Sequence, residues 1–206
     1  MPKSELSKPV GRPRSFDETA AIDAAIQVFW KRGFDGASLS ELTAAMGIKP
    51  GSLYGAFGNK QELFRRALQR YLVTEVSFIQ DALNEPTALA VAQRILKESA
   101  LFLSRHGFPR GCMTIQGSQV ITEEGAQIHK ELLDLRVRSQ RKLRHRLSRA
   151  MREGDLPKNA KPDSLARFLV SIYQGMTIQS VNGASRKDLL DLAEVSLLAW
   201  PMTKAA

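Results

Sequence analysis

The sequence predicts an all-α fold, with an N-terminal three-helix helix-turn-helix domain followed by a larger helical domain. Apolar residues recur at three- and four-residue spacing through most of the chain, which is the period of an amphipathic helix. No alternating apolar and polar run is long enough to indicate a strand. Glycine, proline and Asn-Gly positions separate the periodic segments. We therefore expect an arm at 1–15, the helix-turn-helix domain at 16–62 and the second helical domain at 63–206.

Composition is that of a globular protein. The 206 residues are 43% hydrophobic and 25% charged, enough to bury a core. No apolar run reaches the length of a membrane span, and the first residues lack the apolar stretch of a signal peptide. A single cysteine cannot form an internal disulfide, so nothing indicates an oxidising compartment. We expect a cytoplasmic protein with no membrane partner.

The first fifteen residues are typical of a flexible basic arm, because they show no apolar period and contain more basic than acidic side chains. The arm includes Arg12 and Arg14. A helix is expected from Phe16, with Asp17 and Glu18 in its first turn and Gly33 as its end. Its apolar face consists of Ile22, Ala25, Ile26 and Phe29.

Two short helices and a tight turn come next. Ser38 and Glu41 have the spacing of a capping box, which opens a helix at about 39–46. We expect this helix to turn Leu42, Ala45 and Met46 inward. Gly47 permits the positive φ of a tight turn, and Pro50 suits the first turn of a third helix that runs to about Phe57. Asn59 is expected to cap a fourth helix, with Glu62 three residues later.

The rest of the chain remains helical in pattern. Segments near 87–105, 112–121, 123–153, 163–182 and 187–200 are separated by glycine and proline positions. The last two segments, joined by Asn182-Gly183, predict a helical hairpin. Its apolar faces contain Leu165, Phe168, Leu169, Ile172, Leu189, Leu190, Ala193 and Leu197.

A Gly-containing turn between two short helices is the helix-turn-helix motif, whose second helix enters the DNA major groove. The segment from Phe16 to Leu68 resembles the DNA-binding domain of TetR/AcrR-type transcriptional regulators. The resemblance rests on Phe29–Phe34, "Ser38-Leu-Ser-Glu-Leu", "Met46-Gly-Ile", "Gly51-Ser-Leu-Tyr-Gly-Ala-Phe57" and "Asn59-Lys-Gln-Glu-Leu-Phe64", preceded by Gly11-Arg-Pro-Arg14. It covers about a quarter to a third of the chain.

The resemblance implies a set of DNA contacts. Tyr54 matches a tyrosine that meets a phosphate, and Lys60 matches a lysine that opens the fourth helix against the DNA backbone. Ser38 and Ser40 would contact phosphate at a helix N-terminus, where free amides favour anions. The positions that would reach base edges or flanking phosphates are Lys49, Gly51 and Ser52. Arg12 and Arg14 could enter the adjacent minor groove.

Some of these residues have a purely structural alternative. Phe57 is expected to be a core aromatic of the three-helix unit, whereas Tyr54 can bury its ring and still expose its hydroxyl to solvent. Lys49 stands where the family commonly has serine, so the recognition helix lacks a side-chain cap, and a lysine there strengthens phosphate contact more than base readout. Thr43 stands where the family commonly has alanine.

The resemblance also implies a homodimer, in which the C-terminal hairpins named above pair across a twofold axis. The alternative is that they pack only within one chain. Dimerisation is favoured because two recognition helices one DNA turn apart need a twofold protein.

The net charge of +9 is unevenly placed. The helix-turn-helix segment 16–60 is close to neutral, whereas 128–153 has nine cationic side chains against three acidic ones. This long basic face is expected to be solvated; the alternative is a second contact with DNA.

A pocket for a small-molecule effector of unknown identity is implied by the same resemblance. Candidate lining residues are Phe78, Phe102, His106, Cys112, Met113, Gln116, Ile172, Tyr173 and Met176. Each of them could instead be plain core, because Met and aromatic residues at helical spacing usually are. Cys112 could be a redox switch, but it has no resolving partner and a buried thiol is inert.

Enzyme chemistry is not indicated. The three histidines show no metal-ligand spacing, and the sequence contains no phosphate-binding glycine loop and no G-x-S-x-G motif, so we expect no cofactor and no metal. The sequence therefore predicts a ligand-responsive dimeric repressor that binds double-stranded operator DNA. The alternative is an all-helical adaptor without operator specificity.

Overall fold

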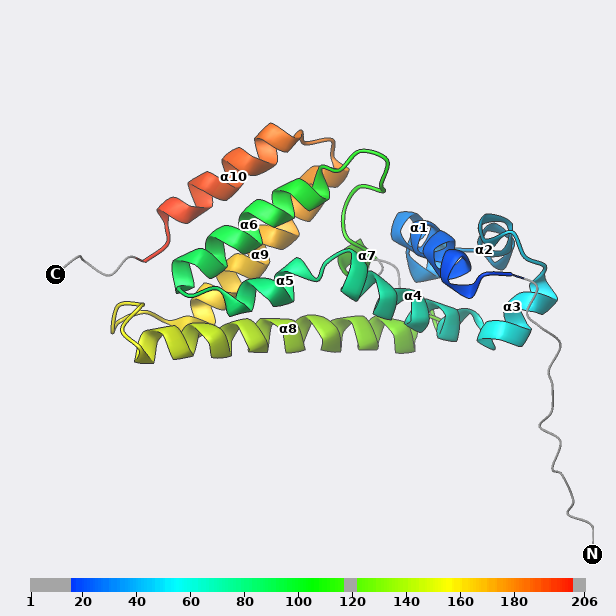
Figure 1. Ribbon diagram of the computed structural model, residues 1–206, viewed down its shortest axis with the longest axis horizontal. Helices are drawn as coiled ribbons and strands as arrows, with labels where there is room; N and C mark the ends of the chain where they lie inside the picture. The colour runs from blue at the N-terminus through cyan, green and yellow to red at the C-terminus, as the bar shows by residue number, and fades with distance from the viewer. Residues whose placement is uncertain (1–15, 117–121, 202–206) are drawn as a thin grey trace, which may run out of the picture.

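The computed structural model describes residues 16–116 and 122–201, and every regular element in these ranges is a helix. The molecule is elongated, with α1–α4 gathered into a head at one end and the later helices extending away from it (Figure 1). The predicted all-α class is confirmed. The arm at 1–15, with Arg12 and Arg14, lies outside the described residues.

The head follows the local signals of the sequence closely. It consists of α1 (Glu18–Gly36), α2 (Leu39–Met46), α3 (Pro50–Phe57) and the start of α4 (Lys60–Thr74). Ser38 and Glu41 form the predicted capping box, and Asn59 accepts from the Glu62 amide at 2.8 Å. Gly47 adopts φ 65°, the left-handed conformation that ends α2 and lets the chain turn into α3.

One local expectation is confirmed and one is corrected. Gly33 interrupts the first helix as expected, with the non-helical angles φ 72° and ψ −179°, and a short further helical stretch continues from this kink to Gly36. In α2, Ala45 is exposed instead of buried, and Thr43 takes the inward position. The Thr43 hydroxyl is satisfied there because it donates to the Leu39 carbonyl at 2.8 Å.

An aromatic cluster holds the head together. The Phe64 ring of α4 meets Phe29 edge-on at 4.9 Å and Phe34 at 5.4 Å, both from α1. Leu42 and Leu53 close the same core from α2 and α3 and are fully buried. Edge-to-face aromatic pairs add to area burial, so α4 fixes the orientation of the helix-turn-helix on α1.

The remaining helices form a layered body. They are α5 (Phe78–Asp81), the short 3₁₀ helix η1 (Ala82–Asn84), α6 (Ala88–Leu103), α7 (Met113–Gln116), α8 (Ala126–Arg152), α9 (Pro162–Val181) and α10 (Arg186–Leu198). The long α8 runs along one side, α6 and α9 pack across it, and α10 lies on the outside against α6 (Figure 1). The sequence pattern did not separate α5 and η1. Of the predicted helix at 112–121, residues 117–121 lie outside the described residues.

The end of α1 is joined to the start of α8 by a buried polar junction. The Asp35 carboxylate lies 2.6 Å from His129 Nε2, and these side chains are only 8% and 7% exposed. Asp35 also accepts from the Thr122 hydroxyl. A Cβ added at Gly125, the N-cap of α8, would overlap the Asp35 carboxylate, so glycine permits this close approach.

Two further contacts tie the head to the body. Arg65 of α4 and Glu131 of α8 form a two-bonded ion pair, with Nη2–Oε1 at 2.8 Å and Nε–Oε2 at 3.1 Å. The Trp30 indole stacks on Phe102 at 5.4 Å and donates to the Gly111 carbonyl at 3.0 Å. The position of the head therefore depends on α6, α7 and α8 as well as on its own core.

Candidate DNA-binding site

The outward face of α2, the turn and α3 carries most of the residues expected to contact DNA. The exposed residues of this set are Ser38, Ser40, Lys49, Gly51 and Tyr54, whereas Ser52 and Lys60 are half-buried. A Cβ added at Gly51 or Gly55 would meet no described atom within 4 Å, so the backbone of α3 is open to close approach. A surface of this kind, small and polar with one protruding aromatic, suits the DNA major groove.

Tyr54 and Phe57 of α3 differ sharply in exposure. Phe57 is 1% exposed and lies in the core, as expected, whereas Tyr54 is 50% exposed. The core interpretation of Tyr54 is therefore excluded by the structure. Its side chain therefore lies on the solvent-exposed face of α3.

Lys60 begins α4 at the edge of this surface. Its ammonium lies 4.5 Å from the centre of the Phe34 ring, a cation–π contact that orients the side chain while leaving the charge half-exposed. The N-cap of α3, Lys49, makes no side-chain capping bond, as expected from its sequence. Its ammonium is therefore not engaged in capping α3.

The acidic side chain of Glu41, near the site, is held by hydrogen bonds and by an ion pair. Hydrogen bonds from Ser38, first from its backbone and then from its hydroxyl, hold the pKa of Glu41 below its usual value. Arg32 lies 3.3 Å from the same carboxylate. Glu41 is thus ionised as a helix cap, and Arg32 offsets its charge.

Comparison with known proteins identifies both parts of the chain. The family model for bacterial regulatory proteins of the tetR family matches residues 21–67, and the tetracyclin repressor-like C-terminal domain matches 88–187. The HTH-type transcriptional repressor ComR of Escherichia coli K12 is 32% identical over 95% of this chain and 94% of its own length. The chain belongs to the TetR family.

Other relatives agree with this assignment. The transcriptional repressor BdcR of Escherichia coli K12 is 40% identical over 57% of this chain and 60% of that protein. A cysteine mutant of the TetR family regulator CifR, complexed with 26-base-pair operator DNA, is 38% identical, with a TM-score of 0.88 over 92% of this chain and 100% of that chain. This TetR protein is a DNA-binding transcriptional regulator and not an enzyme.

Two further findings concern the described part of this TetR chain. No group of three or more His, Cys, Asp or Glu residues there could hold a metal ion. No helix there is long and apolar enough to cross a membrane.

The TetR C-terminal hairpin, α9 and α10, divides its apolar residues between two faces. Leu169, Leu189 and Ala193 are buried inside the chain, so they do not face outward as expected for a dimer interface. The other expected interface residues, which are half-buried, are Leu165, Phe168, Ile172, Leu190 and Leu197. The outward apolar residues of the hairpin are Ile178, Val181, Val195 and Leu198.

The expected effector residues do not share one cavity. Phe78 and Phe102 line an outer groove of about 760 Å³ between α5 and α6. Tyr173 lines a separate inner cavity of about 310 Å³. The others lie outside both cavities: Cys112, Met113 and Met176 are buried, Gln116 and Ile172 are half-buried, and His106 is exposed.

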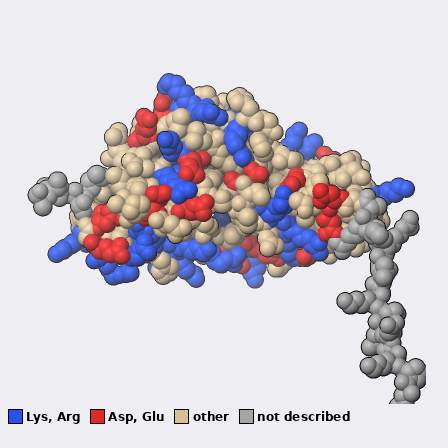
Figure 2. Space-filling model, in the orientation of Figure 1, with Lys and Arg blue, Asp and Glu red and all other residues tan. Residues whose placement is uncertain are grey.

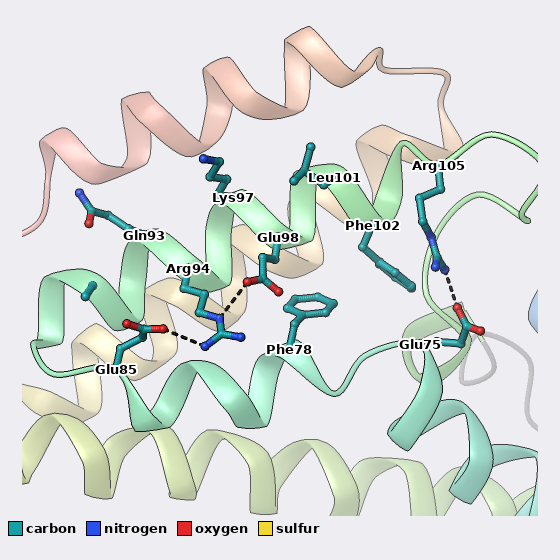
Figure 3. A pocket seen from close by; sticks show the side chains of 11 residues that line it. Glu75, Phe78, Glu85, Gln93, Arg94, Lys97, Glu98, Leu101, Phe102 and Arg105 are labelled. Carbon is teal, nitrogen blue, oxygen red and sulfur yellow. Dashed lines mark hydrogen bonds and ion pairs between the residues drawn. The ribbon is translucent and has the colours of Figure 1, made fainter.

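The outer groove is lined by charged pairs that satisfy one another (Figure 3). The Arg94 guanidinium lies between Glu85 and Glu98, at 2.8 Å from each. Arg105 pairs with Glu75 at 2.6 Å and stacks on the Phe102 ring. Both arginines of this groove already have carboxylate partners, whereas Lys97, which also lines it, is exposed.

The basic helix α8 runs away from the head. Its N-terminal end approaches α4, where the Gln61 amide donates to the Glu124 carbonyl just before the helix starts. From Glu131 to Arg152 the helix rises about 30 Å, and the cations gather along the edge of the molecule that α8 forms (Figure 2). Most of this face is solvated, but Arg146 is turned inward and donates to the Glu85 and Pro86 carbonyls at 2.7 and 3.2 Å.

Sequence reasoning missed two residues. Gly55 lies beside Tyr54 on the open face of α3, and its i, i+4 spacing from Gly51 could have indicated this. Arg136 lines the inner cavity. It follows the buried Leu132 by four residues, a spacing that places it on the inward side of α8.

Proposed function

We propose that this protein is a dimeric repressor that binds a palindromic operator and is released by a small-molecule effector. The observation that carries the proposal is the exposed polar face of α2 and α3, with Tyr54 at its centre, in a chain of the TetR family. In this proposal Ser38, Ser40 and Tyr54 bind phosphates, while Lys49, Gly51 and Ser52 face base edges or flanking phosphates. Lys60, Arg12 and Arg14 add electrostatic attraction.

We also assign these roles to separate parts of the chain. The arm at 1–15 would reach the minor groove, the helix-turn-helix domain at 16–62 would read the operator, and the part at 63–206 would dimerise and bind the effector. We place the protein in the cytoplasm, where operator DNA is accessible to it.

A homodimer is supported by the outer faces of α9 and α10. Ile178 and Val195 are 52% and 63% exposed, which leaves an apolar surface uncovered in one chain. A Cβ added at Gly175, on the same side of α9 as Ile178, would meet nothing within 4 Å, so another helix could approach closely there. Pairing the two hairpins about a twofold axis would cover this surface and set the two heads side by side.

Selection of binding sites from random double-stranded DNA tests the proposal. We expect a palindromic consensus whose half-site centres are about one helical turn, 10–10.5 base pairs, or a multiple of it apart. Enrichment of a single unpaired half-site, or no consensus, would contradict a dimeric operator-binding repressor.

Tyr54→Phe should weaken binding to operator and to random DNA by a similar factor. The change removes only a hydroxyl that we assign to a phosphate, and a hydrogen bond to a charged group contributes roughly 1.5–3 kcal/mol. We expect about a tenfold or greater loss in a fluorescence-anisotropy titration. A loss confined to operator DNA would instead assign Tyr54 to base readout, and an unchanged affinity would remove it from the interface.

Lys60→Ala should reduce the salt dependence of DNA binding. Each phosphate contact contributes about one to the slope of log affinity against log salt, so the slope should fall by about one. Lys60→Arg is the control, because it keeps the charge and the contact with the Phe34 ring and should leave the slope unchanged. An equal slope for the alanine variant and the parent protein contradicts the assignment.

A further inference from the structure

The inner cavity has the size and walls of a small-molecule site. It has a volume of about 310 Å³ and is bounded by α4, α5, α7, α8 and α9. Its apolar wall is formed by Leu72, Val76, Ile79, Ile115, Leu135 and Val170. Ligand pockets in proteins are mostly apolar, with a few polar groups that fix orientation. Since a water occupies about 30 Å³ in the liquid, the cavity suits a molecule on the order of ten non-hydrogen atoms.

The charged groups of this cavity are all of one sign. Arg136, Arg138 and Lys142 line it from α8, and its described lining contains no Asp or Glu. The outer groove differs, because its lining contains Glu75, Glu85 and Glu98 as well as cations.

Arg136 is held at the cavity by its neighbours. Its Nη1 donates to the Thr114 carbonyl of α7 at 2.6 Å, so the guanidinium is fixed between α7 and α8. Burial lowers the pKa of Arg136, because removal from water opposes its charge. An anion bound in the cavity would stabilise the charged form of Arg136.

A second polar group of the lining is buried. The hydroxyl of Tyr173 forms no hydrogen bond of normal geometry within the described residues, although the weakly bonding Cys112 thiol is near. Burial raises the pKa of Tyr173 far above its usual value, so the hydroxyl keeps its proton and can donate it.

We propose that the inner cavity binds an organic carboxylate, with its head group at Arg136 and its apolar body against the wall formed by α4, α5 and α9. The inference deepens the effector step of the proposed function and rests on it. Arg138 and Lys142 strengthen the attraction without contacting the head group directly. The ligand carries one negative charge and on the order of ten non-hydrogen atoms.

Titration calorimetry of the full-length protein without DNA tests the ligand class with three probes of matched chain length: octanoate, octan-1-ol and octylamine. We expect octanoate to bind about tenfold or more tightly than octan-1-ol, as a charged hydrogen bond would give, and octylamine not to bind. Equal or tighter binding of octan-1-ol or octylamine overturns the proposal, as does no binding of octanoate.

Variants locate the head group. Arg136→Gln should weaken octanoate about tenfold or more while leaving octan-1-ol unchanged, and Arg136→Lys should restore part of the loss. Arg141→Gln is the matched control, because this exposed arginine of α8 lies outside the inner cavity. Equal losses in Arg136→Gln and Arg141→Gln would overturn the assignment. If Arg136→Gln does not fold, the double variant Arg138→Gln and Lys142→Gln should weaken octanoate several-fold, and an unchanged affinity there overturns the proposal.

A DNA titration separates this inference from the proposed function. If operator DNA binds normally and octanoate does not bind, the inference fails and the DNA-binding function stands. If octanoate binds to the cavity but leaves operator affinity unchanged, the site and its ligand class stand and the effector role of the proposed function fails.

Discussion

Replacing Ile178 and Val195 together with glutamate is expected to convert the protein to a monomer and to weaken operator binding about a hundredfold or more. The two residues are 52% and 63% exposed on the outer faces of α9 and α10. Four carboxylates brought together across a twofold axis would repel one another and would lose water in the interface. A monomer presents one recognition helix, so it keeps only half of the operator contacts.

Sedimentation measures the first effect and an operator titration the second. Val73→Glu is the matched control, because Val73 is 69% exposed on α4, outside the α9–α10 hairpin, and should leave mass and affinity unchanged. A dimeric mass for the double variant would show that another face forms the interface.

The second large effect is expected at the junction between the head and α8. Asp35→Asn keeps the shape of the side chain but removes the charge that binds His129 Nε2 at 2.6 Å and Thr122. A hydrogen bond to a charged group contributes roughly 1.5–3 kcal/mol, so the free energy of unfolding should fall by about that amount. Asp163→Asn is the control. Its pair with Arg167 is more than half exposed on both sides, so it should change stability by less than about 0.5 kcal/mol.

The pH dependence of this difference follows from the Asp35 carboxylate. Burial opposes its ionisation, but hydrogen bonds from Thr122 and His129 and the charge of His129 outweigh burial, so the pKa lies below its ordinary value of 3.8. A lowered folded pKa contributes stability that is present above the ordinary value and lost as pH falls through the folded one. Denaturant titrations should therefore show the full difference between Asp35→Asn and the parent at about pH 5, and a shrinking one below about pH 4. A difference that grows toward low pH would contradict this assignment.

The junction would give the proposed effector step a physical route. Asp35 and Trp30 belong to α1 of the head, whereas their partners His129, Phe102 and the Gly111 carbonyl belong to the body. A ligand that displaces α7 or α8 would move these partners and therefore the head. Asp35→Asn should loosen this link and so reduce the effect of a ligand on operator affinity. Titration of operator DNA with and without the ligand measures this effect.

The local structure of the head could be predicted from short-range signals. The Ser38–Glu41 capping box, the left-handed Gly47 and the first-turn Pro50 act within a few residues, and each lies where its residue type indicates. The exposure of Tyr54 depends on tertiary packing as well, because Tyr54 is exposed only when α3 packs with Leu53 and Phe57 against the core. The helical periodicity of the sequence correctly predicted that Phe57 is buried.

The hairpin and the cavity could not be predicted in the same way. Helical spacing shows that Leu169, Leu189 and Ala193 lie on apolar faces, but it cannot tell a face buried within one chain from a face left for a partner. The cavity combines α4, α5, α7, α8 and α9, which are distant in sequence. Met and aromatic residues, chosen as ligand candidates for their type, turned out to lie largely in the core because large apolar side chains fill interiors first.

The helix-turn-helix, which is close to neutral, and the basic helix α8 show what the sequence and the tertiary structure each determined. By itself the sequence determined the helices, their caps and the order of residues that marks a TetR DNA-binding domain, because those features depend on neighbours a few positions apart. Only the tertiary structure decided which way the cations of α8 point. It turned Arg146 inward to bind the loop before α6, placed Arg136, Arg138 and Lys142 along the inner cavity, and left the other cations of the helix exposed. Those orientations depend on which helices pack against α8, and packing between distant segments is not encoded in any local pattern.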